Sequence, residues 1–233
     1  MLKLENISTG YGKKQVIFDV SFEVKQGEIV LLAGSNGSGK STLLKAIYGI
    51  LPQWDNGQIF FDGENFTGKP TAALLKNGLL YIPQKNNLFD DLTVKENLEM
   101  AGLILSKKLL QQRIENALSI FISLVPHLKR TPMKLSGGER QLLTLAMAIL
   151  HQPKMMLIDE ILNGLSPQNV ALVDDNLKLL NEKNGITLLI AEHRIKESLQ
   201  LANKVIGLKL GKIFTLTGLK TPTDIAELNP LFI

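Results

Sequence analysis

The sequence predicts an α/β protein with a mainly parallel sheet, an N-terminal antiparallel β part and a helical insert. Short apolar runs recur between Gly, Pro or polar residues, at 28–34, 78–84, 155–160, 185–193 and 204–213. The middle runs are apolar at successive positions, which is typical of strands covered by helices on both faces. Residues 93–150 instead combine helical spacing with good helix formers.

Two early segments have the alternating pattern of antiparallel strands. LKLENIS (2–8) and SFEVKQGE (21–28) alternate apolar and polar side chains, which indicates a sheet with one wetter face. PQWDNGQIFFDG (52–63), which contains Trp54, has the composition of a loop that leads into a hairpin.

Three helices are expected within the insert, over TVKENLEMAGLIL (93–105), KKLLQQRIENALSIFISLV (107–125) and GGERQLLTLAMAIL (137–150). Thr93 can cap the first helix, with Glu96 as its capping-box partner. Pro126 and Pro132 are expected to bracket a loop.

A further helix is expected over residues 165–184, with Ser166 before Pro167 as its start. We therefore expect the chain to form one domain, 1–233. We expect it to divide into an α/β core, formed by 1–92 and 151–233, and a helical subdomain, 93–150.

Composition limits the possible functions. The 233 residues carry 26 Lys plus Arg against 22 acids and no cysteine, so disulfides and thiolate metal sites are excluded. No basic block is interleaved with aromatic residues, so no nucleic-acid partner is expected. The N-terminus lacks the layout of a signal peptide, and no apolar run approaches the roughly 18 residues of a membrane span. We therefore expect a soluble, cytosolic chain.

The segment GSNGSGKS (34–41) matches the phosphate loop G-x-x-x-x-G-K-[ST] between a strand and a helix pattern. A plain glycine-rich turn would not require the Lys and Ser. Glycines let backbone N–H groups surround an anion, and the following helix N-terminus adds a favourable dipole. We expect a P-loop NTPase core that binds ATP through Gly34, Ser35, Asn36, Gly37, Ser38, Gly39, Lys40, Ser41 and Thr42. Ser41 is also expected to bind Mg²⁺.

Two acids close the apolar run MMLIDE (155–160). They would be solvated acids at a strand end if the segment stood alone. A phosphate loop, however, needs a second strand end to hold magnesium, and Asp159 is the natural candidate. Glu160 then lies where a carboxylate can polarise a water for attack on the γ-phosphate.

LSGGERQ (135–141) opens a helix with a serine and two glycines. Free N–H groups, a hydroxyl and the helix dipole make a second anion site there, although a simple cap by Ser136 would also fit. With the phosphate loop, the sequence resembles the ATP-binding subunits of ABC transporters, whose signature is LSGGQ. The resemblance assigns nucleotide contacts to Ser136, Gly137, Gly138 and Glu139.

The resemblance implies further site residues along nearly the whole chain. Tyr11, in GYGKK, matches the aromatic that stacks on adenine, unless it is a turn tyrosine. Gln84 matches a glutamine that approaches Mg²⁺ near the membrane partner, unless it is only a polar strand end. His193, in AEHR, matches the histidine that contacts the γ-phosphate. His127 and His151 match nothing and are expected to be surface or loop residues.

Three positions depart from the family pattern. Ile161 follows the glutamate where proline is usual, Ser166 stands in the loop NGLSP where aspartate is common, and Met147 replaces a frequent arginine. None of them removes a phosphate, metal or water ligand. These three departures affect the expected coupling between the two ATPase subunits of a dimer, not the expected binding of ATP.

The resemblance implies an ATPase subunit, peripheral on the inner face of the cell membrane. Its expected partners are integral membrane permease subunits and a second copy or a related ATPase subunit, which close together on two ATP molecules. The pattern is most similar to branched-chain amino-acid uptake, and envelope-lipid exporters share much of it. ABC ATPases that act on DNA or ribosomes usually carry a long coiled coil or two cassettes. A simple phosphate-loop kinase leaves LSGGERQ unexplained.

Overall fold

The computed structural model describes residues 1–194 and 198–218, and the end of the expected core, 219–233, lies outside them. A four-stranded antiparallel sheet has the order β2-β1-β4-β5. Its strands are β1 (Leu2–Tyr11), β2 (Lys14–Val24), β4 (Gln58–Phe61) and β5 (Glu64–Asn65). The antiparallel N-terminal part and the hairpin after Trp54 are as expected.

A six-stranded sheet has the order β10-β9-β3-β8-β7-β6. Its strands are β3 (Ile29–Ala33), β6 (Leu79–Ile82), β7 (Met155–Asp159), β8 (Thr187–Glu192), β9 (Lys204–Lys209) and β10 (Lys212–Gly218). All neighbours pair in parallel except β9 and β10, which form an antiparallel hairpin. The apolar run 204–213 is therefore divided by a turn, where Leu210 and Gly211 have positive φ angles.

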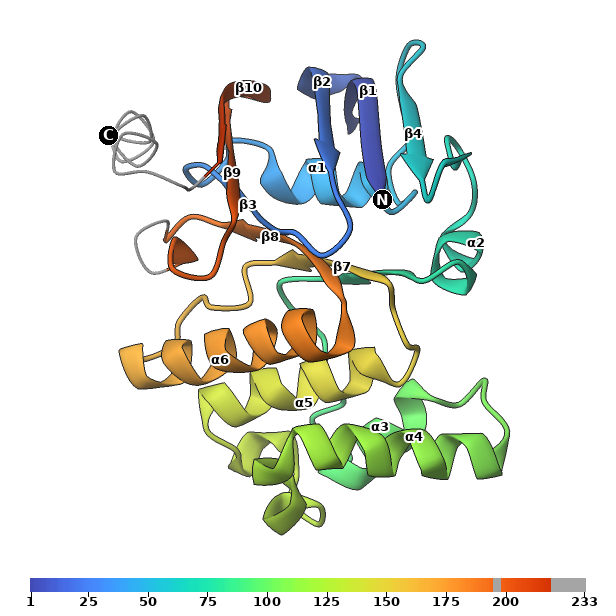
Figure 1. Cartoon of the computed structure of the whole chain (residues 1–233), viewed down its shortest axis with the longest axis vertical. Helices are drawn as coiled ribbons and strands as arrows, with labels where there is room; N and C mark the ends of the chain where they lie inside the picture. Colours follow the sequence, from blue (N-terminus) through green and yellow to red (C-terminus); the bar gives the residue numbers. More distant parts are fainter. Residues whose placement is uncertain (195–197, 219–233) are drawn as a thin grey trace.

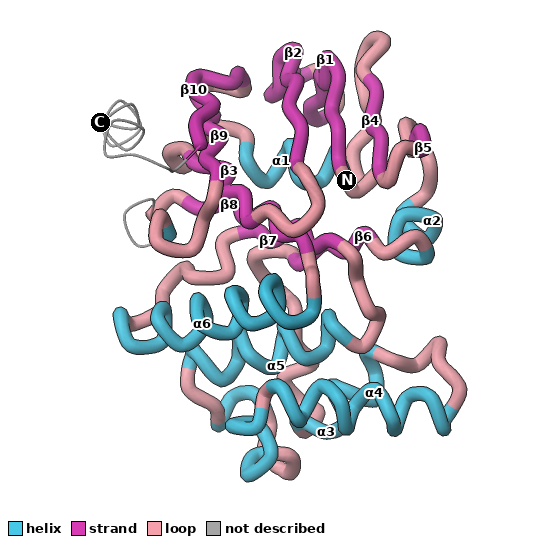
Figure 2. Tube along the Cα trace, in the orientation of Figure 1, coloured by secondary structure: helices cyan, strands magenta, loops and turns pink. Residues whose placement is uncertain are grey.

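The helices form layers on both faces of this sheet (Figures 1 and 2). They are α1 (Lys40–Ile47), α2 (Thr71–Lys76), α3 (Val94–Ala101), α4 (Lys107–Ile120), α5 (Gly137–Ile149) and α6 (Pro167–Asn184), with 3-10 helices η1 (Ile122–His127) and η2 (Pro132–Lys134). Helix α1 lies between the six-stranded and the antiparallel sheets, whereas α5 and α6 cover the opposite face and α3 and α4 lie beyond them (Figure 1).

Alternation along the parallel strands builds two separate cores, because successive side chains point to opposite faces. Met156, Ile158 and Ile190 pack into the core of α5 and α6. Met155 and Leu157 pack into the core of α1 and the antiparallel sheet. Every residue of β7 is buried, as expected for strands covered on both faces.

Local capping signals are confirmed. Thr93 and Glu96 form the reciprocal capping box of α3. Ser166 is the N-cap of α6, and Pro167 is its first residue. However, α3 ends at Ala101 with Gly102 as its C-cap, so the expected helix over 93–105 was too long.

The loop expected between Pro126 and Pro132 is present as the turn over residues 128–131, which joins two 3-10 helices. Pro126 lies inside η1 and Pro132 begins η2. The connection is structured because the free N–H groups at the start of α3 donate to it. The N–H groups of Val94 and Lys95 bond the carbonyls of Arg130 and Leu128.

Candidate active site

The phosphate loop lies between the end of β3 and the start of α1. A Cβ at Gly34 would come within 2.4 Å of the Leu208 carbonyl oxygen, and Gly37 has a φ of 80°. Both positions therefore require glycine. The Lys40 side chain is buried, and its Nζ donates to the carbonyl oxygens of Gly34 at 2.9 Å and Ser35 at 3.2 Å. The loop thus holds an ammonium against its own backbone.

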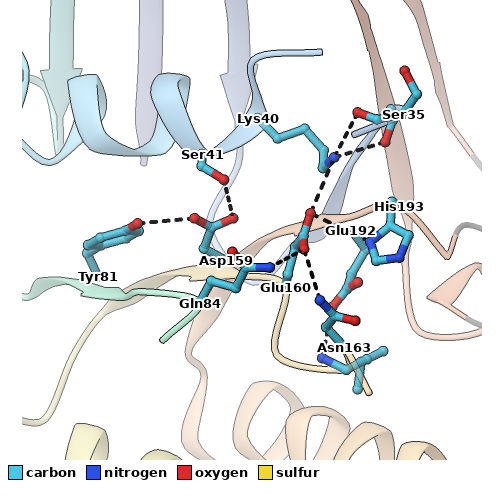
Figure 3. Close-up of polar contacts among 12 residues, drawn as sticks. Ser35, Lys40, Ser41, Tyr81, Gln84, Asp159, Glu160, Asn163, Glu192 and His193 are labelled. Atoms are coloured by element: carbon cyan, nitrogen blue, oxygen red, sulfur yellow. Dashed lines mark hydrogen bonds and ion pairs between the residues drawn. The ribbon is translucent and has the colours of Figure 1, made fainter. Parts of the chain in front are cut away.

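Asp159 receives hydrogen bonds on both carboxylate oxygens (Figure 3). The Ser41 hydroxyl donates to Oδ1 at 2.9 Å, and the Tyr81 hydroxyl donates to Oδ2 at 3.2 Å. Burial raises the pKa of Asp159, and these two hydrogen bonds act in the opposite direction. A hydroxyl and a carboxylate are hard oxygen ligands of the type that Mg²⁺ prefers, so the pair Ser41 and Asp159 fits this ion.

Glu160 lies at the centre of a polar cluster drawn from four segments of the chain (Figure 3). Gln84 Nε2 donates to Oε2 at 2.5 Å, and Asn163 Nδ2 lies 3.5 Å from the same oxygen. Lys40 Nζ and His193 Nδ1 each lie 3.6 Å from Oε1. The structure therefore brings Lys40, Gln84 and His193, three of the residues selected from the sequence, around one carboxylate.

The backbone of Glu160 has a φ of 48°, which is uncommon outside glycine. The Glu160 N–H donates to the Ala191 carbonyl at 2.9 Å, beyond the regular pairing of β7 with β8. Non-glycine residues held in this region often occur at functional sites, where surrounding contacts maintain them. Here the conformation turns the carboxylate back toward Lys40 and Gln84.

The LSGGE segment forms the N-terminus of α5 and is capped internally. Ser136 Oγ accepts from the Glu139 N–H at 3.2 Å, and the Ser136 N–H donates to Glu139 Oε2 at 2.7 Å. A Cβ at Gly137 would lie 2.9 Å from Leu165 Cδ2, and one at Gly138 would lie 2.7 Å from Asn169 Oδ1. The glycines therefore allow Leu165, before α6, and Asn169, in the first turn of α6, to approach this turn.

The signature turn and the phosphate loop start helices in different layers. Helix α5 packs on one face of the six-stranded sheet and α1 on the other (Figure 1). Tyr11 ends β1 at the hairpin with β2, and its side chain is 47 % exposed. Ser136 to Glu139 and Tyr11 thus lie outside the cluster around Glu160.

Comparison with known proteins decides the family. The family model described as ABC transporter matches residues 17–163, which include the phosphate loop, the signature turn and the two acids Asp159 and Glu160. The chain belongs to the ABC transporter family. As an ABC ATPase it binds and hydrolyses ATP.

Relatives of this ABC ATPase include proteins with different named roles. It is 36% identical over 213 residues to the high-affinity branched-chain amino acid transport ATP-binding protein BraG of Pseudomonas aeruginosa. The matched region covers 91% of this chain and 91% of that protein. It is 35% identical over 216 residues to the lipopolysaccharide export system ATP-binding protein LptB of Haemophilus influenzae, covering 91% of this chain and 88% of that protein.

A solved structure extends the comparison to an assembly. The dimeric structure of a post-hydrolysis state of the ATP-binding cassette MJ0796, bound to ADP and Pi, has a TM-score of 0.81 and 26% sequence identity. The match covers 95% of this chain and 100% of that one. In the described part of this ABC ATPase, no helix has the length and apolar character needed to cross a bilayer.

Sequence reasoning missed two residues close to the acids of this ABC ATPase. Tyr81 contacts Asp159, and Glu192, the last residue of β8, has no exposed surface. Glu192 Oε1 accepts from the Leu162 N–H at 3.0 Å, and burial raises its pKa to about 7. The segment AEHR could have identified Glu192, because an acid that continues an apolar strand is expected to be buried, and a buried acid requires a hydrogen-bonding partner.

The expectation that His127 is an unmatched surface or loop residue was wrong. His127 Nε2 lies 2.9 Å from Glu139 Oε1, and the imidazole is only 17 % exposed. The two residues are 12 positions apart and belong to η1 and α5, so only the packing of η1 against α5 brings them together. His151 follows the end of α5, and its pKa is lowered, chiefly by burial.

A groove of about 270 Å³ lies between the core and the helical layer, and Pro83 and Asn86, on either side of Gln84 in the sequence, line it. Its lining includes Tyr81 and Pro83 from the core and Thr144, Met147 and His151 from the α5 region. The ring of Tyr81 therefore reaches from this groove to Asp159. Met147, one of the departures from the family pattern, also lies here.

Proposed function

We propose that this ABC ATPase is a separate ATP-hydrolysing subunit of a membrane transporter for small solutes such as amino acids. The observation that carries the enzymatic part is the convergence of Lys40, Gln84 and His193 on Glu160, beside the Ser41–Asp159 pair. The similarity to BraG over 91% of both chains supports uptake of an amino acid. The similarity to LptB makes lipopolysaccharide-type export the alternative.

Nucleotide binding is assigned to the phosphate loop. Lys40 would exchange its contacts with the Gly34 and Ser35 carbonyls for the outer phosphate oxygens of ATP, which are better acceptors because they are charged. The backbone N–H groups of residues 34–39 and the start of α1, with Ser41 and Thr42, would hold the inner phosphates. The exposed ring of Tyr11 is available to stack on adenine.

Ser41 and Asp159 would hold Mg²⁺, with Gln84 close by. When bound, this ion would neutralise part of the negative charge on the phosphate oxygens. Tyr81 and the start of α1 fix the Asp159 carboxylate from opposite sides. The protein thereby supplies a pre-oriented ligand pair, and the remaining ligands would come from ATP and water.

Glu160 is proposed to accept the proton of the attacking water. Its carboxylate must be ionised for this, and the Lys40 ammonium lies 3.6 Å from it. Gln84 and Asn163 bond the other oxygen and fix its direction. His193, 3.6 Å from the same carboxylate, would contact the γ-phosphate beside that water.

A shared site in a dimer explains why α1 and α5 lie in different layers. Ser136, Gly137, Gly138 and Glu139 of one chain would face the ATP held by Lys40 of the other. The dimeric structure of MJ0796 with ADP and Pi supports this arrangement. We further propose that residues 93–150 act as a helical subdomain that moves against the core 1–92 and 151–233 when ATP closes the dimer.

The membrane partner is proposed to occupy the groove beside Gln84. Pro83 lines the groove and the next residue, Gln84, bonds Glu160, so a permease segment in the groove could change the position of the catalytic carboxylate through this segment. The ATPase would then be peripheral on the cytoplasmic face of the membrane, next to separate permease subunits.

The coupling role is tested with Gln84→Ala. The variant should keep a measurable nucleotide affinity but lose stimulation of ATPase activity by the co-purified membrane subunits. Gln111→Ala, on the exposed face of α4, is the matched control and should respond like wild type. If Gln84→Ala is stimulated as strongly as wild type, the assignment of this residue is wrong.

Substrate and partner class need a separate experiment. The tagged Glu160→Gln chain should co-purify with integral membrane proteins, whereas ribosomes or nucleic acid in its place would contradict a transport role. Cells that carry only Glu160→Gln should then lose uptake of one labelled amino acid. Unchanged amino-acid uptake together with a defect in envelope lipid would favour the export alternative.

A further inference from the structure

Residue 139 is an acid where the family signature, LSGGQ, has glutamine. Both oxygens of Glu139 are engaged in this structure. Oε2 accepts the Ser136 N–H at 2.7 Å, and Oε1 lies 2.9 Å from His127 Nε2. The carboxylate is therefore held in one orientation by two separate segments of the chain.

His127 acts here through Nε2. Its Nδ1 is buried and has no hydrogen-bond partner within residues 1–194 and 198–218. A proton on Nδ1 would leave a buried donor unsatisfied, which costs free energy. The contacts therefore fit the neutral tautomer, in which Nε2–H donates to Glu139 Oε1.

An untethered carboxylate at this position would be harmful to an anion site. The first turn of a helix attracts negative charge through its free N–H groups and its dipole. A freely rotating Glu139 could cover the N–H groups of Gly137 and Gly138 and would repel an approaching phosphate. A glutamine at the same place carries no charge and causes no such conflict.

We propose that His127 is a positioning residue that holds the Glu139 carboxylate against Ser136 and keeps the signature turn open to the partner's ATP. The inference rests on the proposed shared site, because it requires that residues 136–139 face a nucleotide. His127 compensates for the acid at 139. It should therefore matter only while that residue is a glutamate.

The test is a double-mutant cycle in a Glu160→Gln background, which holds ATP without turnover. The ATP concentration that gives half-maximal dimer is measured by light scattering. His127→Leu, which removes the donor, should raise this concentration about tenfold or more, in line with the loss of one hydrogen bond to a charged group. His127→Gln should remain near the parent, because its amide nitrogen reaches as far from the backbone as Nε2 does.

In chains that also carry Glu139→Gln, His127→Leu should have almost no effect. An equal effect in both backgrounds would show that His127 only supports packing and would overturn the inference. The inference would also be overturned if His127→Leu had no effect in chains that keep Glu139.

Thermal denaturation without nucleotide checks that each variant is folded. If His127→Leu does not fold, His127→Asn replaces it, since the shorter amide cannot reach Glu139 and should behave as a loss of the donor. A parent that stays monomeric in ATP would overturn the shared site and the inference together. A parent that dimerises, with equal effects in both backgrounds, would overturn the inference alone.

Discussion

The Tyr81 hydroxyl donates a hydrogen bond to Asp159 Oδ2 at 3.2 Å, on the side of the carboxylate opposite Ser41. The pKa of this tyrosine is raised, chiefly by burial and next by the charge of Asp159, so the hydroxyl stays a donor. Its ring lies 5.7 Å from that of Tyr48, at an angle of 39°. A half-buried tyrosine thus fixes the expected metal ligand.

Tyr81→Phe is expected to lower the affinity of the nucleotide site for Mg²⁺, because Asp159 loses one of its two orienting bonds. The Mg²⁺ concentration for half-maximal nucleotide binding should rise about tenfold, as for other second-layer contacts to metal ligands. Titration with a fluorescent nucleotide measures it. Tyr48→Phe removes the same atom from the stacking partner and should leave the titration unchanged. Identical curves for Tyr81→Phe and wild type would contradict the role.

Glu160→Gln is expected to retain ATP binding but to lower turnover by about 10²- to 10⁴-fold, the range for loss of a general base. Glutamine can still bond Gln84 but cannot take a proton from water. ATP-bound dimers should accumulate, which light scattering detects. Glu64→Gln, on the exposed strand β5, should turn over like wild type. A monomer in every nucleotide state, with normal ATP affinity, would count against a closing dimer.

Mixing two defective chains tests whether the site is shared. Lys40→Ala deletes the charge on the outer phosphates, and Gly137→Asp places a carboxylate in the signature turn. Neither homodimer has a working site, whereas a heterodimer has one doubly defective and one intact site. With Glu160→Gln in both chains, mixing should restore close to one ATP per dimer, measured by equilibrium binding.

Position 137 suits this experiment better than 138. An added Cβ at Gly137 meets only the end of the Leu165 side chain, whereas at Gly138 it meets the amide and Cβ of Asn169. Gly137→Ala is the control for bulk and should bind more ATP than Gly137→Asp. No rescue at any ratio, with heterodimers demonstrated, would exclude the shared-site mechanism.

Glu192 is expected to make stability depend on pH. Its pKa rises from its ordinary 4.5 to about 7 in the folded protein, chiefly through burial. Between these values the folded state binds more proton than the unfolded state, so stability falls as pH rises from about 4.5 to 7 and changes little above that. The full effect is on the order of 3 kcal/mol.

Glu192→Gln removes this titration. Urea unfolding at pH 5 and pH 8 should show a smaller loss of stability in Glu192→Gln than in wild type. Glu182→Gln, on the exposed part of α6, should keep the wild-type pH dependence. If Glu192→Gln loses as much stability as wild type between these pH values, another group is responsible.

The sequence by itself determined the parts of this protein that depend on local pattern. Continuous apolar runs predicted the buried parallel strands, because both faces of such strands are covered by helices or by the other sheet. The phosphate loop, Asp159 and Glu160 followed from residue types at strand ends. The caps at Thr93 and Ser166 were predictable because an N-cap acts within three residues.

Only the tertiary structure decided which distant residues meet. Tyr81 reaches Asp159 because β6 pairs with β7, and His127 reaches Glu139 because η1 packs against α5. Glu192 takes its raised pKa from the surrounding core, which no local pattern encodes. The phosphate loop and the signature turn lie in different layers because the chain crosses the sheet between α1 and α5. Spatial relations of this kind depend on packing between segments far apart in the sequence.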